Sequence, residues 1–384
     1  MSGLRVLHVK ADVNPEGGGS VTAIMSAIRS SLLSGHSATL LSTRLLHEDH
    51  HIALARESPD AAIVILPRAR SHTYSPTGSL WNWLERNIRL FDVVVIHEVF
   101  SFPAVAAAHW ARRAGVPYVI RPHGSLDPYD MRKHSRLKTL LRPVFGRYLQ
   151  NSAGIWLTAQ KEAERAVTYG VAVPRFVSVL PVPRPEFVGR PDAFRARVGA
   201  APSDFVWLFL GRLDRKKGLE RTIAAYSAVR RPSSWLVIAG SGDPEYEREL
   251  RMASCADPSI VFLGFVRGQE RADAFAGADL FVLHSDNENF GLAPVEALHH
   301  GLPSLLSDQV FVSDLLADCA AASVVSVRDL AGLRHFMHAA ECGDLARPDE
   351  DHLASALAIF DPIRVARLDG EILEQVAARR EDRR

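Results

Sequence analysis

Short runs of aliphatic and β-branched residues recur along the whole chain, and segments with helical spacing lie between many of them. Runs of this kind are typical of strands in a parallel sheet that is covered on both faces. The clearest helical segment repeats its apolar positions at intervals of three and four, at Val21, Ile24, Met25, Ile28 and Leu32. Strand and helix in alternation form the βαβ unit, so the chain is predicted to be an α/β protein.

A proline-rich stretch, LPVPRPEFVGRP, divides the strand-like runs into two series. Its prolines deny the backbone regular hydrogen bonding and indicate a linker between domains. The length of 384 residues also favours two cores over one. We therefore predict two Rossmann-like, doubly wound domains that face each other across a cleft, at 1–185 and 192–362. The last helical segment, within 363–384, either stays with the second domain or crosses back to the first.

Composition excludes several classes of function. The chain has 45 Lys and Arg against 44 Asp and Glu, so its net charge of +1 supplies no general field for nucleic acid. Its three cysteines lie far apart and form no CxxC pair, which argues against a disulfide framework or a zinc site and fits a reducing cytoplasm. The N-terminus lacks the pattern of a secretory signal, and the apolar runs are too short to span a bilayer. We expect a cytoplasmic enzyme.

The segment SDNENFGLAPVEALHHGLP carries the strongest chemical signal. Glu288 and Glu296 are separated by seven residues, directly after a strand-like run. Gly291 permits a tight turn and Pro294 suits the first turn of a helix, which places Glu288 in a loop and Glu296 in the helix. Free N–H groups at Gly291 and Leu292 would then attract a phosphate. Two solvated glutamates that help to cap a helix are the alternative.

A second segment, FLGRLDRKKGLE, makes that alternative less attractive. A strand ends at Leu210, Gly211 frees the turn, and Arg212, Lys216 and Lys217 follow in a loop before a helix. An arginine fork and a lysine point charge are suited to clamp a pyrophosphate. A solvated basic turn is the other interpretation of this motif.

Together these motifs resemble the second domain of the family 4 retaining glycosyltransferases, GT-B enzymes of bacterial glycan assembly, with G-R-x(4)-K-G and E-x(7)-E in order. The resemblance implies that Glu288 contacts the donor sugar, that Glu296 holds the ribose, and that Arg212 and Lys217 stabilise the leaving diphosphate. It also implies a wider set of donor-binding positions, namely Gly18, Gly19, Gly211, Gly240, Val266, Asn289, Phe290, Gly291 and Leu292. Gly240 and its neighbour Gly242 are equally consistent with plain packing of a βα turn.

In the first domain, Gly17, Gly18 and Gly19 lie between the first strand and the first helix, where a glycine loop can cradle phosphate. A nicotinamide enzyme is disfavoured, because there is no GxGxxG spacing and no acidic residue at the end of the second strand. The motif RPHGSLDPYD matches the His-Gly loop of the family, which makes His123 a contact to the transferred sugar. Residues in nearby loops are candidates for contacts to the acceptor, namely Glu98, Arg121 and Asp127.

Two further segments are open to more than one interpretation. His47, His50 and His51 cluster without the spacing of a metal site, so we interpret them as a solvated loop. Residues 131–148 interleave basic and apolar side chains, and such a face can rest on the anionic inner surface of the plasma membrane near a lipid-linked acceptor. A helix packed on its own domain with a solvated basic side explains the pattern equally well.

The expected function is transfer of a hexose from a UDP- or GDP-sugar to a saccharide or lipid-linked saccharide, with retention at the anomeric carbon. Under this hypothesis the enzyme needs no cofactor and no metal, and nucleic acid is not a partner. Two alternatives remain open. One is a subunit that binds a sugar nucleotide without catalysis, and the other is a GT-B isomerase that acts on a sugar nucleotide alone.

Overall fold

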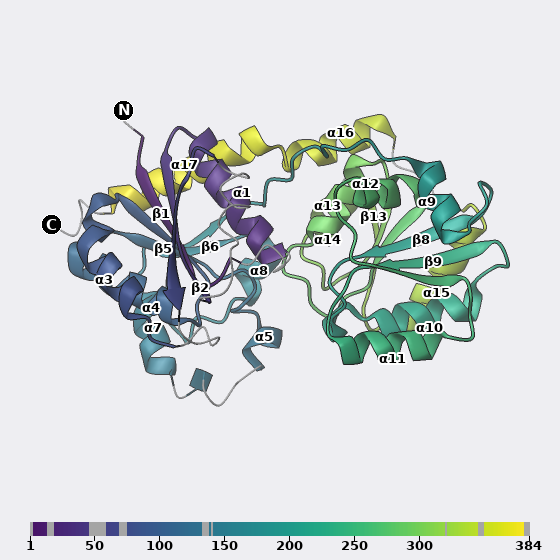
Figure 1. Ribbon diagram of the computed structural model, residues 1–384, viewed down its shortest axis with the longest axis horizontal. Helices are drawn as coiled ribbons and strands as arrows, with labels where there is room; N and C mark the ends of the chain where they lie inside the picture. The colour runs from purple at the N-terminus through teal and green to yellow at the C-terminus, as the bar shows by residue number, and fades with distance from the viewer. Residues whose placement is uncertain are drawn as a thin grey trace. The chain divides into compact units, whose positions relative to one another are not determined.

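The computed structural model describes residues 3–13, 19–45, 59–68, 75–132, 138–139, 141–318, 321–344 and 349–379. The chain divides into two compact units (Figure 1). The first unit comprises Met1–Pro181 together with Phe360–Arg384, and the second unit comprises Val182–Ile359. Each unit is a parallel sheet with helices on both faces, so the predicted α/β fold class is confirmed.

The first unit is built on a sheet with the strand order β3-β2-β1-β4-β5-β6-β7, paired in parallel throughout. Its strands are β1 (Arg5–Lys10), β2 (Ser37–Leu45), β3 (Ala62–Arg68), β4 (Val93–His97), β5 (Tyr118–Arg121), β6 (Gly154–Leu157) and β7 (Arg175–Val177). All five residues of β4 are buried, as expected for a strand that is covered on both faces. The chain reverses its direction along the sheet between β3 and β4, so a crevice for a ligand is expected at the carboxyl ends of the adjacent strands β1 and β4.

Helices cover both faces of this sheet. They are α1 (Gly19–Leu33), α3 (Gly78–Asn87), the 3-10 turn η2 (Ile88–Leu90), α4 (Phe102–Ala114), α5 (Pro128–Arg132), α7 (Arg142–Gln150), α8 (Gln160–Arg165) and α17 (Pro362–Ala378). Helix α17 lies beside α1 in Figure 1. Its residues Ile372, Leu373 and Val376 pack against Val6 and Val93 of the sheet, so the last helix belongs to the core of the first unit.

The second unit has a six-stranded parallel sheet with the order β10-β9-β8-β11-β12-β13. Its strands are β8 (Phe205–Leu210), β9 (Ser234–Ala239), β10 (Ile260–Gly264), β11 (Leu280–Leu283), β12 (Ser304–Ser307) and β13 (Ala322–Val325). The chain again reverses its direction along the sheet, here between β10 and β11, so that β11 lies on the other side of β8. A crevice for a ligand is therefore expected where the loops after β8 and β11 meet.

The helices of the second unit form two layers, with α10, α11 and α15 on one face of the sheet and α9 and α12 on the other (Figure 1). They are α9 (Pro191–Val198), η3 (Arg215–Lys217), α10 (Leu219–Val229), α11 (Pro244–Ser254), α12 (Gly268–Gly277), α13 (Leu292–His299), α14 (Ser313–Asp318), α15 (Leu330–Glu341) and α16 (Glu350–Ile359). Across both units, no helix within the described ranges is long and apolar enough to cross a membrane.

Candidate functional site

The loops after β8 and β11 meet at the carboxyl edge of the second sheet. The main-chain carbonyl of Lys216 accepts a hydrogen bond of 2.7 Å from the N–H of Asp286, which ties one loop to the other. Beside this bond, the Lys217 ammonium forms an ion pair with the Glu288 carboxylate. Their side chains are 12% and 17% exposed. Two of the predicted catalytic residues are therefore brought into direct contact in a largely shielded position.

Several positive charges act on Glu288. Burial opposes ionisation of its carboxyl group, but the charges of Lys217, Lys216 and Arg212 outweigh that effect and hold its pKa below the ordinary value. Arg212 itself is 62% exposed on its side chain and lies 3.9 Å from Asp214. Glu288 is thus a permanent carboxylate at neutral pH, surrounded by the cations that the sequence selected.

The main chain holds the Glu288 loop from its other side. The N–H of Glu288 donates to the carbonyl of Gln309 at 3.0 Å, and the N–H of Phe311 donates to the carbonyl of Glu288 at 3.2 Å. Gly291 ends the loop with a φ of 91°, and a Cβ there would lie 2.9 Å from Cγ1 of Val310. Only glycine fits this turn, because the conformation is left-handed and the space is filled.

Helix α13 begins at Leu292, and because its N-cap residue is Gly291, no side chain caps its first N–H groups. Its first N–H groups therefore keep their capacity to bind an anion. Close by, Oδ1 of Asn289 is buried and has no hydrogen-bond partner among the described residues, whereas Phe290 is 3% exposed and packs into the core. A buried acceptor without a partner is costly, so Asn289 is a position that a ligand could satisfy.

Glu296 is positioned differently from Glu288. It lies on α13 and accepts hydrogen bonds from the guanidinium of Arg271 on α12, one of them 2.8 Å long. Nothing in the sequence marks Arg271, because an arginine inside an ordinary helix gives no signal of its own. A ligand that uses Glu296 would share this carboxylate with Arg271.

The remaining predicted donor-binding positions of the second unit lie in the turns that follow its strands. Gly211 follows β8, and a Cβ on Gly240 would lie 1.8 Å from the carbonyl oxygen of Gly211. Gly240 therefore has a packing reason for lacking a side chain, which was one of its two interpretations. Val266 is 3% exposed and follows β10, next to Phe265, which is 65% exposed.

In the first unit, two strained residues stand at the carboxyl ends of neighbouring strands. Glu98 follows β4 with a φ of 122°, and His123 follows β5 with a φ of 48°. Backbone strain in residues other than glycine is concentrated at functional sites. Glu98 accepts a hydrogen bond of 2.8 Å from the N–H of Ala11 and lies 3.6 Å from the Lys10 ammonium. These contacts join the loop after β4 to the end of β1.

The loop that carries His123 is held by a buried carboxylate that the sequence analysis missed. Oε1 of Glu162 accepts from the N–H of Gly124 at 2.9 Å, and Oε2 accepts from the N–H of Thr158 at 2.7 Å. Glu162 is 3% exposed. Its position in the sequence, five residues after the end of β6, is the only signal that could have found it.

The other two acceptor candidates are buried. Arg121 is 1% exposed, with its guanidinium 4.2 Å from the ring centroid of Trp156 and 4.0 Å from the carboxylate of Asp369. Asp127 is 3% exposed and pairs with Arg165 at 2.9 Å. Both side chains contribute to the interior of the first unit, and of the three acceptor candidates only Glu98 is partly exposed.

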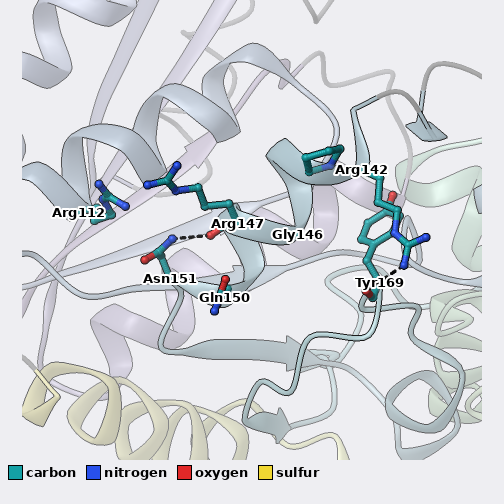
Figure 2. Close-up of a pocket in the computed structure, with 8 residues that line it drawn as sticks. Arg112, Arg142, Gly146, Arg147, Gln150, Asn151 and Tyr169 are labelled. Carbon is teal, nitrogen blue, oxygen red and sulfur yellow. Dashed lines mark hydrogen bonds between the residues drawn. The ribbon is translucent and has the colours of Figure 1, made fainter.

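Part of the basic stretch 131–148 forms the wall of a surface groove. A cavity of about 800 Å³ is lined by Arg112, Arg142, Pro143, Gly146, Arg147, Gln150, Asn151 and Tyr169. Arg112 and Arg147 lie near one end and Arg142 lies beside Tyr169 at the other (Figure 2). Lys138 is not part of the surface, because it is 8% exposed and its ammonium donates to the carbonyl of Asp130. Residues 133–137 and 140 of this stretch lie outside the described residues.

Some sequence-based predictions fall where the structure gives no description. Gly17, Gly18 and the three histidines His47, His50 and His51 lie outside the described residues. Gly19 is described and is the first residue of α1. Within the described ranges, no group of three or more His, Cys, Asp or Glu side chains could hold a metal ion.

Two family models match the chain, one over each unit. Residues 18–183 match the glycosyl transferase 4-like domain, and residues 192–333 match the glycosyl transferases group 1 model. The chain belongs to the family 4 glycosyltransferases. Its two parallel sheets correspond to the GT-B fold of this family, as the sequence predicted.

Relatives of this glycosyltransferase support the assignment. An uncharacterized glycosyltransferase from Methanocaldococcus jannaschii is 37% identical over 116 residues, which is 30% of each chain. A GDP-mannose-dependent alpha-mannosyltransferase from Mycobacterium tuberculosis is 26% identical over 323 residues, 82% of each chain. The HepE protein from Anabaena, solved in complex with UDP and glucose, has a TM-score of 0.77 at 17% identity, covering 97% of this chain and 99% of its own.

Proposed function

We propose that this glycosyltransferase moves a hexose from a nucleoside diphosphate donor to a hydroxyl group of a saccharide or lipid-linked saccharide, with retention at the anomeric carbon. In this reaction the bond between C1 and the diphosphate oxygen breaks. A new bond forms between C1 and the acceptor oxygen on the same face. The proton of the acceptor hydroxyl moves to the departing phosphate, so atoms and charges balance.

The observation that carries this proposal is the contact between Lys217 and Glu288, with Arg212 and Lys216 around it. A nucleoside diphosphate offers negative charge to the cations, and a sugar offers hydroxyl groups to the carboxylate. Charge grows on the diphosphate as the C1–O bond breaks, and Arg212 and Lys217 are in position to offset it. The proposal therefore includes transfer without a metal ion and without a cofactor.

We assign the donor to the second unit and the acceptor to the first. The uncapped start of α13 and the buried Asn289 acceptor support a diphosphate and sugar at the loop after β11. The strained Glu98 supports a recognition edge for the acceptor in the first unit, and the strained His123 is assigned to the transferred sugar. In this scheme Glu296 holds the ribose together with Arg271, and the main chain at Val266 meets the base.

The donor is proposed to be a UDP- or a GDP-sugar. HepE was solved with UDP and glucose, and the mycobacterial relative is named for GDP-mannose, so relatives of both kinds support the pair. Recognition of the base through main-chain atoms leaves no side-chain signature that separates uracil from guanine.

We further propose that the arginine groove binds the anionic inner surface of the plasma membrane. Arg112, Arg142 and Arg147 line it, and no acidic side chain in the described part of the chain forms an ion pair with them. Val144, on the same helix as Arg142 and Arg147, is 47% exposed and supplies an apolar contact. A basic face with an apolar residue suits an interfacial helix and would bring the enzyme to a lipid-linked acceptor.

Two alternatives make different products. A non-catalytic binding subunit would bind the donor without slow hydrolysis, and an isomerase would convert the sugar nucleotide in the absence of any acceptor. The test is incubation of the protein with UDP- and GDP-hexoses, first alone and then with an oligosaccharide acceptor, followed by NMR of the products. Slow release of the diphosphate alone, and glycoside formation only with acceptor, supports transfer.

A further inference from the structure

Three histidines from neighbouring strands form a continuous hydrogen-bonded chain inside the first unit. Nδ1 of His8 on β1 lies 2.9 Å from Nε2 of His97 at the end of β4, and Nδ1 of His97 lies 2.9 Å from Nε2 of His123 after β5. The rings of His97 and His123 are stacked, with centroids 5.2 Å apart and planes 10° apart. His8 and His97 are buried, whereas His123 is half-buried.

The far end of this chain is anchored on α1. Nε2 of His8 lies 3.1 Å from the hydroxyl of Ser31. That hydroxyl also lies 3.1 Å from the carbonyl oxygen of Ala27, to which it donates. A hydroxyl has one proton, and a carbonyl can only accept. Ser31 is therefore an acceptor toward His8, which makes Nε2 of His8 the protonated nitrogen.

All three rings are neutral in the folded protein. Burial lowers the pKa of His8 to about 3, and burial together with neighbouring positive charge lowers the pKa values of His97 and His123 well below their ordinary value. A neutral imidazole has one N–H donor and one bare acceptor nitrogen. The role of one ring consequently fixes the role of the next.

The donor and acceptor nitrogens of each histidine follow from those of the ring before it. His8 is protonated on Nε2, so its Nδ1 accepts from Nε2 of His97. His97 is then bare on Nδ1 and accepts from Nε2 of His123. We infer that Ser31, His8 and His97 act as positioning residues that hold His123 in a single tautomer, with the lone pair of its Nδ1 available to accept a hydrogen bond. Among the described residues, none forms a hydrogen bond with this nitrogen.

The group that donates a hydrogen bond to Nδ1 of His123 is a hydroxyl group of the transferred sugar, and this last step rests on the proposed function. A bare Nδ1 accepts from an O–H group and rejects a carbonyl or carboxylate oxygen. His123 thereby becomes a specificity element for a sugar that carries a hydroxyl at one position, because a donor without that O–H leaves the nitrogen unsatisfied. The chain of histidines supplies this selectivity without a charge.

The tautomers can be measured directly by NMR of the ring nitrogens in the full chain labelled with ¹⁵N-histidine at neutral pH. Single His-to-Gln variants at the three positions assign the signals. We expect all three rings to be protonated on Nε2 and bare on Nδ1. A proton on Nδ1 of His123, or exchange between the two tautomers, would overturn the inference. This measurement needs no substrate, so it stands apart from the test of the transfer reaction.

A matched pair of serine variants tests whether the chain sets the tautomer. Ser31→Ala removes the anchoring acceptor, and we expect it to change the tautomer population of His123 three hydrogen bonds away. Ser34→Ala is the control, since the Ser34 hydroxyl donates to the carbonyls of Ser30 and Ser31 and not to the histidines. An unchanged His123 signal in Ser31→Ala refutes the positioning role.

The sugar contact has its own readout. With donor analogues that each lack one hydroxyl, wild type should lose about three- to ten-fold in kcat/KM at the position that binds His123, apart from any position that binds Glu288. Ser31→Ala should show a smaller loss at that same position. Equal losses in the two proteins at every position would overturn the sugar contact even if the tautomers are as expected. Absence of any transfer by wild type would instead count against the proposed function alone.

Discussion

Lys217 and Glu288, 71 residues apart in the sequence, form an ion pair where the loops after β8 and β11 meet. The pair satisfies both charges when no ligand is bound. A diphosphate beside Lys217 would compete for the ammonium and leave the Glu288 carboxylate to accept hydrogen bonds from sugar hydroxyls. The ion pair therefore holds both side chains in place before the donor arrives.

Replacement of Lys217 by alanine should lower kcat/KM for sugar transfer by ten-fold or more. The variant removes a charge-assisted contact to the leaving diphosphate, worth about 1.5–3 kcal/mol. Glu288→Ala and Arg212→Ala should show losses of at least the same size. Steady-state rates of diphosphate release in the presence of acceptor measure all three effects.

The control for this series is Arg215→Ala. Arg215 lies in the same 3-10 turn as Lys217, but its exposed guanidinium pairs with Glu249 at the surface. Its loss should leave kcat/KM at the wild-type value. If Arg215→Ala and Lys217→Ala behaved alike, the general charge of the turn, and not the contact with Glu288, would explain the activity.

Gly291→Ala should destabilise the second unit by roughly 2–4 kcal/mol and weaken donor binding. The alanine would adopt a left-handed conformation, and its Cβ would press on buried Val310, so strain and overpacking add. Gly301→Ala is the matched control just after the end of α13, where φ is 68° and nothing lies within 4 Å. There we expect only the conformational cost of about 1–2 kcal/mol. Urea unfolding measures both; equal costs would contradict the crowding seen at Gly291.

The free energy of unfolding should fall as the pH falls below about 6.5. His8, with a pKa lowered from 6.5 to about 3 by burial, stays neutral in the folded state while the unfolded chain takes up a proton. His97 and His123 have pKa values shifted in the same direction. Stability is thus fully present above the unfolded pKa and is lost as the pH moves down toward the folded one.

The size of this pH effect can be bounded. Each histidine that protonates only in the unfolded chain contributes a slope of about 1.4 kcal/mol per pH unit, so three contribute at most about 4 kcal/mol per unit. Urea unfolding at about pH 7.5 and about pH 5.5 measures it. His8→Gln should reduce the slope. A stability that does not change over this interval would show that the three rings are not held neutral.

Charge reversal at Arg142 and Arg147 together should weaken binding to vesicles that contain anionic lipid by at least ten-fold. Each basic residue near such a surface contributes about 1 kcal/mol. Arg197→Glu in the second unit, where Arg197 pairs with Glu270, should bind as wild type does. Cosedimentation with vesicles measures the difference. Unchanged binding after the double reversal would contradict the proposal that the groove binds the membrane.

The sequence predicted much of the fold because its signals are local. The aliphatic runs Leu4 to Val9, Val93 to Ile96 and Val206 to Leu210 begin and end within one residue of β1, β4 and β8. The pattern at Val21 to Leu32 falls inside α1 (Gly19–Leu33). The aliphatic run Val177 to Leu180 is different, because it shares only Val177 with the strand β7 (Arg175–Val177). Periodicity indicates that a strand exists, and the prolines that follow Leu180 blur where it ends.

The site could be predicted only where residue type and backbone chemistry coincide. Glu288 beside Gly291 is such a case, since a carboxylate, a left-handed glycine and a helix start occur together. The partners that depend on tertiary structure gave no local signal: Arg271 reaches Glu296 from another helix, and Glu162 reaches back to the loop of His123. His8 and His97 sit within apolar strand sequences, where a single polar residue was the only hint.

The basic stretch shows the same limit. Lys138 counted toward a charged face in the sequence, yet its ammonium lies 4.6 Å from the ring centroid of Phe100 and it is buried. Long cationic side chains can face either water or the interior, and sequence spacing does not distinguish these outcomes. Arg142 and Arg147 on α7 are exposed, so the membrane proposal rests on fewer basic residues than the sequence indicated.

The most direct test of the central claim is the binding of UDP and GDP to the wild-type chain and to Lys217→Ala, by calorimetry in the presence of a metal chelator. We predict that wild type binds at least one of the two diphosphates without metal, and that the variant binds it at least ten-fold more weakly while Arg215→Ala binds it as wild type does. Equal affinity in wild type and Lys217→Ala would contradict a donor site at the Lys217–Glu288 pair.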